Sequence, residues 1–325
     1  MRTFASLFSG VGGAEIAAAR LGFKPVFGVE YAPKIAAIHV VNHNSTMLVS
    51  PVQEVNYPDV VRRMPGLNWL HASPACQSFS VVRRGWGNFP NESETEADRT
   101  AAMAVNRALE AFEPDIFTLE NVRGYGKTYS FSRISLQLER LGYQVEVTSR
   151  SPVDYGIPQV RNRLFIVAVR QDALREAGEL IHPAAGGEKP GWGSLLQDGE
   201  PEDWPEAKLY PSFIKAEPDI AAGRIEHPAL VFGARISSTK WSRPFASEPS
   251  STVTASQYKR RVCLIEPGGK VRLVPFEFMA RIQAFPPDFD WSGHKMTDYT
   301  GLGNAICPPV LEALVKPLIA RVNWK

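Results

Sequence analysis

The chain has 325 residues, of which 44% are hydrophobic and 22% are charged, so it is long enough for two domains with buried cores. No run approaches the roughly 20 apolar residues of a membrane-spanning helix, and the N-terminus lacks a signal-peptide pattern, so we expect a cytoplasmic protein. The net charge of +2 neither requires nor excludes nucleic acid. Cys76, Cys263 and Cys307 are too widely spaced for a disulfide framework or a cysteine-based zinc site, and we expect no metal.

Strand-like and helix-like segments alternate over the first 170 residues. The segments with the pattern of short buried strands are 3–8, 26–30, 68–72, 116–120, 144–149 and 164–170. Helical patterns lie between them at 14–21, 33–42, 98–112 and 132–141. Because this alternation is typical of parallel strands joined by helices, we predict an α/β fold with a mostly parallel sheet and helices on both faces.

The character of the sequence changes after about residue 172. From there to about residue 269 it is rich in Pro, Gly, Ser and Trp, and its helical periodicity is weak, which predicts a smaller irregular domain. A helical pattern returns at 275–284, and a final amphipathic helix is expected at 308–322. We therefore predict one domain at 1–172, completed by 298–325, and a small domain at 173–297.

A glycine-rich turn joins the first predicted strand to the first predicted helix. It reads Phe8-Ser9-Gly10-Val11-Gly12-Gly13, and its glycines let the backbone approach a ligand at a helix N-terminus. Glu30 ends the next strand, where a carboxylate can accept hydrogen bonds from ribose hydroxyls, and Tyr31 beside it can stack on an adenine ring. These residues alone are equally consistent with a plain tight turn and a helix-capping glutamate.

Two further motifs follow predicted strands. Ser73-Pro74-Ala75-Cys76-Gln77-Ser78-Phe79-Ser80 places Cys76 on a strand-end loop, where a thiol is exposed. Leu119-Glu120-Asn121-Val122 places Glu120 at the carboxyl end of a strand, which is the usual ligand crevice of a parallel sheet. Taken singly, a buried inert cysteine and a salt-bridged glutamate are as consistent with these patterns.

Two more motifs lie in the second half of the chain. Gln159-Val160-Arg161-Asn162-Arg163 opens the last strand, and because residues two apart point the same way, Arg161 and Arg163 are expected to share a face suited to phosphate or carbonyl recognition. Solvated charges at an exposed edge are the alternative. Gly303-Asn304-Ala305 is expected on the turn before the final helix.

In this order, the motifs resemble the series that marks the cytosine carbon-5 DNA methyltransferases. That family has Phe-Ser/Ala-Gly-x-Gly-Gly, Pro-Cys-Gln, Glu-Asn-Val, Gln-x-Arg-x-Arg, Arg-x-Gln-x-Phe-Pro and Gly-Asn. The fifth motif is supplied here by Arg281, Gln283, Phe285 and Pro286. The resemblance runs from residue 4 to about 310 and omits about 171–269, the variable target-recognition segment of the family.

The chain departs from the family pattern at three places. Ser6 stands where the family often has Asp, and Ala75 stands before the cysteine where the family usually has Pro. An Asp that the family uses near the adenine amine has no counterpart around Ser50-Pro51-Val52. The first and third departures concern the cofactor site, and the second concerns turnover.

The resemblance implies transfer of a methyl group from S-adenosyl-L-methionine to carbon 5 of cytosine in double-stranded DNA, on a Rossmann-like sheet with a small target-recognition domain. The base must be flipped out of the duplex. The Cys76 thiolate would add to carbon 6, and Glu120 would hydrogen-bond or protonate ring nitrogen 3. Arg163 would bind the exocyclic carbonyl oxygen and orient Glu120, while Arg161 would support the same pocket or a phosphate.

The same resemblance assigns binding residues and partners. The cofactor residues are Phe8, Ser9, Gly10, Gly12, Gly13, Glu30, Tyr31 and Asn304. The DNA-binding residues are Gln77, Ser80, Arg83, Arg84, Thr252, Lys259 and Arg260. A monomer of a bacterial, archaeal or phage restriction-modification system is expected, with a cognate restriction endonuclease as a further partner.

Three alternatives remain open from the sequence. A branch of the same family methylates transfer RNA, and the nucleic acid that accepts methyl label distinguishes it. A catalytically weak DNA-binding homologue is supported only by Ser6 and Ala75. A nucleotide-dependent dehydrogenase would need Gly-x-Gly-x-x-Gly spacing, which the turn lacks, and would leave Cys76 without a role.

Overall fold

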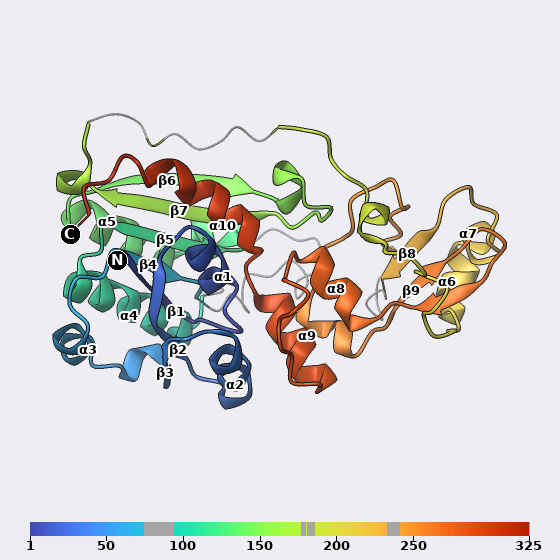
Figure 1. Ribbon diagram of the computed structural model, residues 1–325, viewed down its shortest axis with the longest axis horizontal. Helices are drawn as coiled ribbons and strands as arrows, with labels where there is room; N and C mark the ends of the chain where they lie inside the picture. The colour runs from blue at the N-terminus through green and yellow to red at the C-terminus, as the bar shows by residue number, and fades with distance from the viewer. Residues whose placement is uncertain (75–93, 177–179, 181–185, 233–240, 325) are drawn as a thin grey trace. The chain divides into compact units, whose positions relative to one another are not determined.

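The computed structural model describes residues 1–74, 94–176, 180, 186–232 and 241–324 (Figure 1). The chain forms two compact units. The first contains Met1–Arg150, Asn162–Ala184 and Val310–Lys325, and the second contains Ser151–Arg161 and Ala185–Pro309. Within the described residues, no helix has the length and apolar character needed to cross a membrane.

These units differ from the predicted domain boundaries in three places, the first being that the first unit extends past residue 172 to Ala184. Ser151–Arg161 belongs to the second unit, where Val160 N–H donates to the Ser250 carbonyl and Ser250 N–H donates to the Pro158 carbonyl, both at 2.8 Å. Residues 298–309 also belong to the second unit. The division into a cofactor-binding domain and a target-recognition domain stays a prediction.

The first unit contains a seven-stranded sheet in the order β3-β2-β1-β4-β5-β7-β6. Neighbours from β3 to β5 are parallel, whereas β7 runs antiparallel to both β5 and β6. The predicted α/β class with a mostly parallel sheet is confirmed. The strands are β1 (Thr3–Leu7), β2 (Lys24–Glu30), β3 (Thr46–Val49), β4 (Trp69–Ala72), β5 (Ile116–Asn121), β6 (Tyr143–Arg150) and β7 (Arg163–Arg170).

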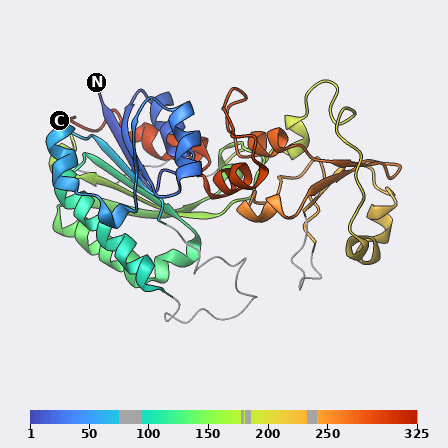
Figure 2. The same cartoon turned by 90° about the horizontal axis from the view of Figure 1, so that it is seen from below.

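Helices cover both faces of this sheet, as predicted. In Figure 2, α3, α4 and α5 form a layer on one face, and α1 lies on the other. The capping box of Thr95 and Asp98 begins α4, because each side chain bonds the other residue's backbone N–H. The helices are α1 (Gly13–Arg20), α2 (Pro33–Asn42), α3 (Tyr57–Arg63), α4 (Glu96–Phe112), α5 (Tyr129–Arg140) and α10 (Pro308–Val315), which enters this unit at Val310.

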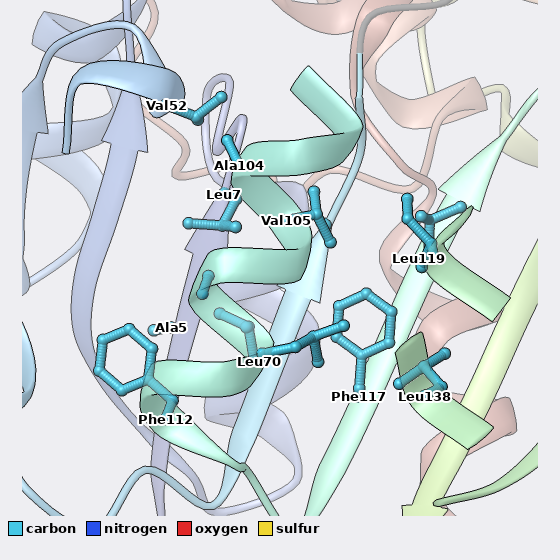
Figure 3. Close-up of a cluster of buried hydrophobic side chains, with 14 of the residues drawn as sticks. Ala5, Leu7, Val52, Leu70, Ala104, Val105, Phe112, Phe117, Leu119 and Leu138 are labelled. Carbon is cyan, nitrogen blue, oxygen red and sulfur yellow. The ribbon is translucent and has the colours of Figure 1, made fainter. Parts of the chain in front are cut away.

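The core of the first unit lies between α4 and the sheet (Figure 3). Leu70 and Phe117 project from the central strands against Val105 and Phe112 of α4. Alanines at positions such as 104 let the helix approach the strands closely. Since each buried large side chain contributes about 1.5–3 kcal/mol, this packing fixes the strand ends where the polar motifs lie.

The second unit contains a three-stranded antiparallel sheet in the order β10-β9-β8, so the domain predicted as irregular has a regular centre. Its strands are β8 (Ala229–Phe232), β9 (Val262–Ile265) and β10 (Val271–Leu273). A core of Phe213, Val231, Trp241 and Ile265 covers one side. The helices are α6 (Pro211–Ala216), α7 (Pro218–Ala221), α8 (Phe276–Ile282) and α9 (Lys295–Asn304).

Candidate active site

The glycine turn curls at the carboxyl ends of β1 and β2. Phe8, Gly10 and Gly12 have positive φ values of 59°, 56° and 98°, a conformation that glycine adopts most readily. Ser9 N–H donates to the Val29 carbonyl at 2.9 Å and ties the turn to β2. Because α1 begins at Gly13, the turn presents the N–H groups of a helix N-terminus, as predicted for an anion-binding or nucleotide-binding turn.

Glu30 supports the turn from the end of β2. Its carboxylate accepts hydrogen bonds from Gly10 N–H at 3.1 Å and Ala32 N–H at 2.9 Å. Burial raises the pKa of Glu30, and these two hydrogen bonds oppose the rise. A carboxylate oxygen can accept a second hydrogen bond, so Glu30 keeps the capacity to bind ribose hydroxyls. Tyr31 beside it is 65% exposed and presents a ring face for stacking.

The loop predicted to carry the nucleophile begins after β4. Cys76, Gln77, Ser80, Arg83 and Arg84 lie outside the described residues. Its first residues are held at the sheet edge, where Asn121 Nδ2 donates to the Pro74 carbonyl at 3.0 Å and Ser73 N–H donates to the Leu7 carbonyl at 3.3 Å. The described chain therefore leads into the loop from a fixed position.

His71 on β4 helps to fix that position. Its ring nitrogens lie 2.8 Å from Thr118 Oγ1 on β5 and 2.8 Å from Ser73 Oγ. Burial lowers the pKa of His71 to about 4, so the ring is neutral at neutral pH. A neutral imidazole donates at one nitrogen and accepts at the other, which suits it to connect these two hydroxyls.

Glu120 and Arg163 meet at the ends of two adjacent strands. Arg163 Nε lies 3.0 Å from Glu120 Oε1, and the side chains are 19% and 7% exposed. The antiparallel register of β5 and β7 brings them together, because Glu120 is paired with Phe165. A carboxylate beside a fixed guanidinium can hold the adjacent ring nitrogen and carbonyl oxygen of a pyrimidine. The contact agrees with the predicted orientation of Glu120 by Arg163.

Arg161 lies elsewhere, and the prediction that it shares a strand face with Arg163 is wrong. The strand begins at Arg163, while Arg161 belongs to the second unit and is 3% exposed. Its guanidinium donates at 2.9–3.0 Å to the backbone carbonyls of Val253, Gly303 and Ala305. The contacts identify Arg161 as a residue that joins three segments of the second unit, and its catalytic role stays a prediction.

Other motif residues join the same hydrogen-bonded network. Gln159 Nε2 donates to Gln283 Oε1 at 2.7 Å and to the Ile282 carbonyl at 3.0 Å. Gln283 Nε2 donates to the Ala305 carbonyl at 2.8 Å, the acceptor that Arg161 also uses. Three motifs that are far apart in the sequence are therefore connected through buried amide and guanidinium groups. We call this set the Gln159–Arg161 network.

Arg161→Ala is expected to destabilise the second unit by about 3 kcal/mol, because several buried carbonyls lose their donor at about 1–3 kcal/mol each. A lower urea midpoint of unfolding measures the effect. Arg224→Ala is the matched control, since Arg224 pairs with Asp219 at the surface of the same unit and such pairs contribute about 1 kcal/mol or less. An unchanged midpoint in Arg161→Ala with a large loss of activity would instead assign it to catalysis.

The remaining predicted residues lie in the second unit. Thr252 Oγ1 donates to the Val160 carbonyl at 2.7 Å, and Lys259 is exposed beside the Tyr258 ring. Arg260 is half-buried. Asn304 ends α9 with an exposed side chain and does not lie on the turn as predicted, because α9 extends through it. No cluster of potential metal ligands occurs among the described residues.

Sequence reasoning missed two buried polar residues beneath the glycine turn, Glu15 and His39, and the half-buried His43 beside them. Glu15 and His39 are fully buried on α1 and α2, and His43 follows α2. The alanine-rich sequence of α1 indicated a buried helix, and the glutamate within it was the available signal. The two histidines lie four residues apart in the sequence, but only His39 is in α2, because His43 follows its last residue with an extended backbone.

Solved structures share this fold. A putative DNA modification methyltransferase encoded within an E. coli prophage has a TM-score of 0.72 at 19% identity, with 99% of each chain covered. The S. pombe Dnmt2 methyltransferase has a TM-score of 0.67 at 16% identity, with 98% of this chain and 99% of that chain covered. The chain therefore has the same fold as these two proteins.

The family follows from the sequence comparison. The model of the C-5 cytosine-specific DNA methylases matches residues 2–320, so the chain belongs to that family and is a DNA (cytosine-5-)-methyltransferase. The type II methyltransferase M.AplI of Arthrospira platensis is 27% identical, with 95% of this chain and 83% of that protein covered. M1.HphI of Haemophilus parahaemolyticus is 25% identical, with 99% and 87% covered.

Proposed function

We propose that this methyltransferase takes its methyl group from S-adenosyl-L-methionine and acts on a flipped-out cytosine in a specific double-stranded sequence, through a covalent bond to Cys76. The contact between Glu120 and Arg163 carries the proposal. It supplies a carboxylate for ring nitrogen 3 and a guanidinium for the carbonyl oxygen of cytosine. The contact lies at the carboxyl end of β5, the strand beside β4, and β4 leads into the Cys76 loop.

The glycine turn is suited to the methyl donor. Backbone N–H groups at the start of α1 can bind a carboxylate, Glu30 can accept from ribose hydroxyls, and Tyr31 can stack on adenine. When bound, S-adenosyl-L-methionine supplies an electrophilic methyl group. The predicted contact from Asn304 stays part of this proposal.

The chain's own residues would activate the cytosine. The Cys76 thiolate forms a bond to carbon 6, and Glu120 hydrogen-bonds or protonates ring nitrogen 3 while Arg163 holds the carbonyl oxygen. Carbon 5 thereby becomes nucleophilic and accepts the methyl group. Loss of the carbon-5 proton to a base, with water as the candidate, then breaks the bond to sulfur and restores the aromatic ring.

DNA contacts would come from the loop after Cys76 and from the second unit. Gln77, Ser80, Arg83 and Arg84 are proposed to contact the target site, and Thr252, Lys259 and Arg260 to contact DNA from the second unit. The relatives that are type II methyltransferases support a restriction-modification role, with a monomeric enzyme and a cognate endonuclease as parts of the proposal.

Trapping on DNA with 5-fluorocytosine at the target tests this function. Fluorine cannot leave carbon 5 as a cation, so Cys76 should stay bonded to carbon 6 after methyl transfer. We expect a shifted band in denaturing electrophoresis that needs S-adenosyl-L-methionine for full yield. Trapping only on fluorinated RNA would support the RNA alternative, and no adduct would support the binding-only homologue. An adduct that persists in Cys76→Ala would identify a different nucleophile.

A further inference from the structure

A group of ionisable and hydroxyl side chains lies buried directly beneath the glycine turn. Glu15, in the first turn of α1, is fully buried, and His39 Nε2 of α2 lies 3.2 Å from its Oε1. Ser6 Oγ donates to the same carboxylate, and Ser6 Oγ lies 2.7 Å from Ser9 Oγ in the turn. Glu15 is therefore connected both to β1 and to the turn.

His43 connects this group to the turn from the other side. Its ring centroid lies 4.7 Å from that of His39, and it hydrogen-bonds the Val11 backbone. A Cβ added at Gly12 would lie 2.0 Å from His43 Nε2, so the imidazole fills the space where any side chain at Gly12 would lie. His43 therefore packs directly against the turn at Gly12.

Packing alone does not require these ionisable groups. A buried pair of ionisable side chains is often no more stabilising than apolar side chains of similar volume, because both groups lose their hydration. A role in fixing the orientation of neighbouring groups would explain why such a pair is present here. Burial would raise the pKa of Glu15, but attraction and hydrogen bonding from His39 outweigh it and lower the pKa to about 2. Glu15 is therefore ionised at every working pH.

We propose that Glu15, His39 and His43 form a positioning network for the glycine turn, and that the charge on His43 sets how tightly the turn binds the methyl donor. The inference rests on the proposed cofactor role of the turn. The contacts of His43 with Val11 and Gly12 hold the turn in its binding conformation. Protonation adds a positive charge beneath a site that must accept a positively charged sulfonium.

The direction of the pH effect follows from the surroundings of His43. Burial lowers the pKa of His43 from 6.5 and His39 reinforces the shift, whereas Glu15 and the hydrogen bond to the Val11 backbone oppose it. The folded protein favours the neutral ring. The stabilisation that the neutral ring provides is therefore complete above pH 6.5 and declines as the pH falls through the lowered pKa of His43. Two further ionisable groups interact with this cluster: Glu30, whose pKa is raised by burial, interacts with His39, and His71 interacts with Glu15.

Calorimetric titration of the full chain with S-adenosyl-L-methionine, between about pH 5.5 and 7.5, tests the proposal. The parent should bind more weakly as the pH falls. His43→Ala should weaken binding about tenfold at the upper pH and flatten the pH dependence, because the turn loses its support. His43→Gln should recover part of the affinity but keep the flat profile. His227→Gln, at an exposed histidine, should reproduce the parent curve.

Glu15→Gln provides a second, directional readout. Glu15 attracts a proton to His43, so its neutralisation should move the midpoint of the pH profile to lower pH. A purely structural role would not produce that shift. Parent-like curves in the His43 and Glu15 variants would overturn the positioning network, whereas absence of binding in the parent at every pH would overturn the cofactor proposal instead. If His43→Ala does not fold, the His43→Gln and Glu15→Gln curves decide.

Discussion

Cys76→Ala is expected to abolish methyl transfer and to leave S-adenosyl-L-methionine binding within about twofold of the parent, because the proposed nucleophile is on a different loop from the glycine turn. Without the thiolate, carbon 5 stays a poor nucleophile and no alternative covalent route exists in the proposed mechanism. Transfer of tritiated methyl groups to DNA measures the rate, and calorimetric titration measures binding. A residual rate of about a tenth of the parent would contradict covalent catalysis.

Cys263→Ala is the control for this experiment. Cys263 is fully buried on β9, and burial raises its pKa, so its thiol is neither exposed nor ionised at neutral pH. The variant should transfer methyl groups at the parent rate. Loss of transfer in this control, with the fold intact, would show that the cysteines had been assigned to the wrong roles.

Glu120→Gln is expected to slow methyl transfer by about a hundredfold or more, the usual scale for removing a positioned acid. Glutamine keeps an oxygen where Arg163 Nε now lies 3.0 Å from Glu120 Oε1, so the arginine should stay in place while the acid is lost. Single-turnover kinetics with saturating DNA and cofactor isolate the chemical step. An unchanged rate would remove Glu120 from the mechanism.

The matched control for Glu120→Gln is Glu312→Gln. Glu312 Oε1 lies 3.0 Å from Arg20 Nη1, so it has the same kind of partner at the same distance, but both side chains are partly exposed on helices. Its neutralisation removes a surface ion pair that contributes about 1 kcal/mol or less. Methyl transfer should therefore proceed at the parent rate in this variant.

The sequence was sufficient to predict the parts of the fold whose patterns are local. Helix α2 was predicted with its observed limits, because Pro33 marks its first turn. Strand β3 was missed, since its apolar run is only the three residues Met47-Leu48-Val49 and all four residues of the strand are partly or fully exposed. The sheet of the second unit was missed for a related reason: its strands have only three or four residues and lie between segments rich in proline and glycine.

The candidate site shows a similar limit. The pairing of Glu120 with Arg163 was predictable, because both residues flank strands and belong to recognisable motifs. The role of Arg161 was not predictable, because it donates to the backbone carbonyls of Val253, Gly303 and Ala305. Every residue has a backbone carbonyl, so the residue types at these positions do not indicate the contact. The contacts of Glu15 with the two histidines were not predicted either, because the sequence does not show how the helices that carry them are oriented relative to each other.

The Gln159–Arg161 network has a consequence for exchanging the second unit, the proposed target-recognition domain, between relatives. The second unit is built from two separate stretches of chain, and the shorter one, Ser151–Arg161, lies between β6 and β7 of the first unit. A chimera that exchanges Ala185–Pro309 alone would replace the segments that Gln159 and Arg161 contact with segments from a relative, while Gln159 and Arg161 themselves stay unchanged. Transplants of recognition properties between relatives should therefore carry both stretches together, or retain the acceptor carbonyls that Arg161 binds.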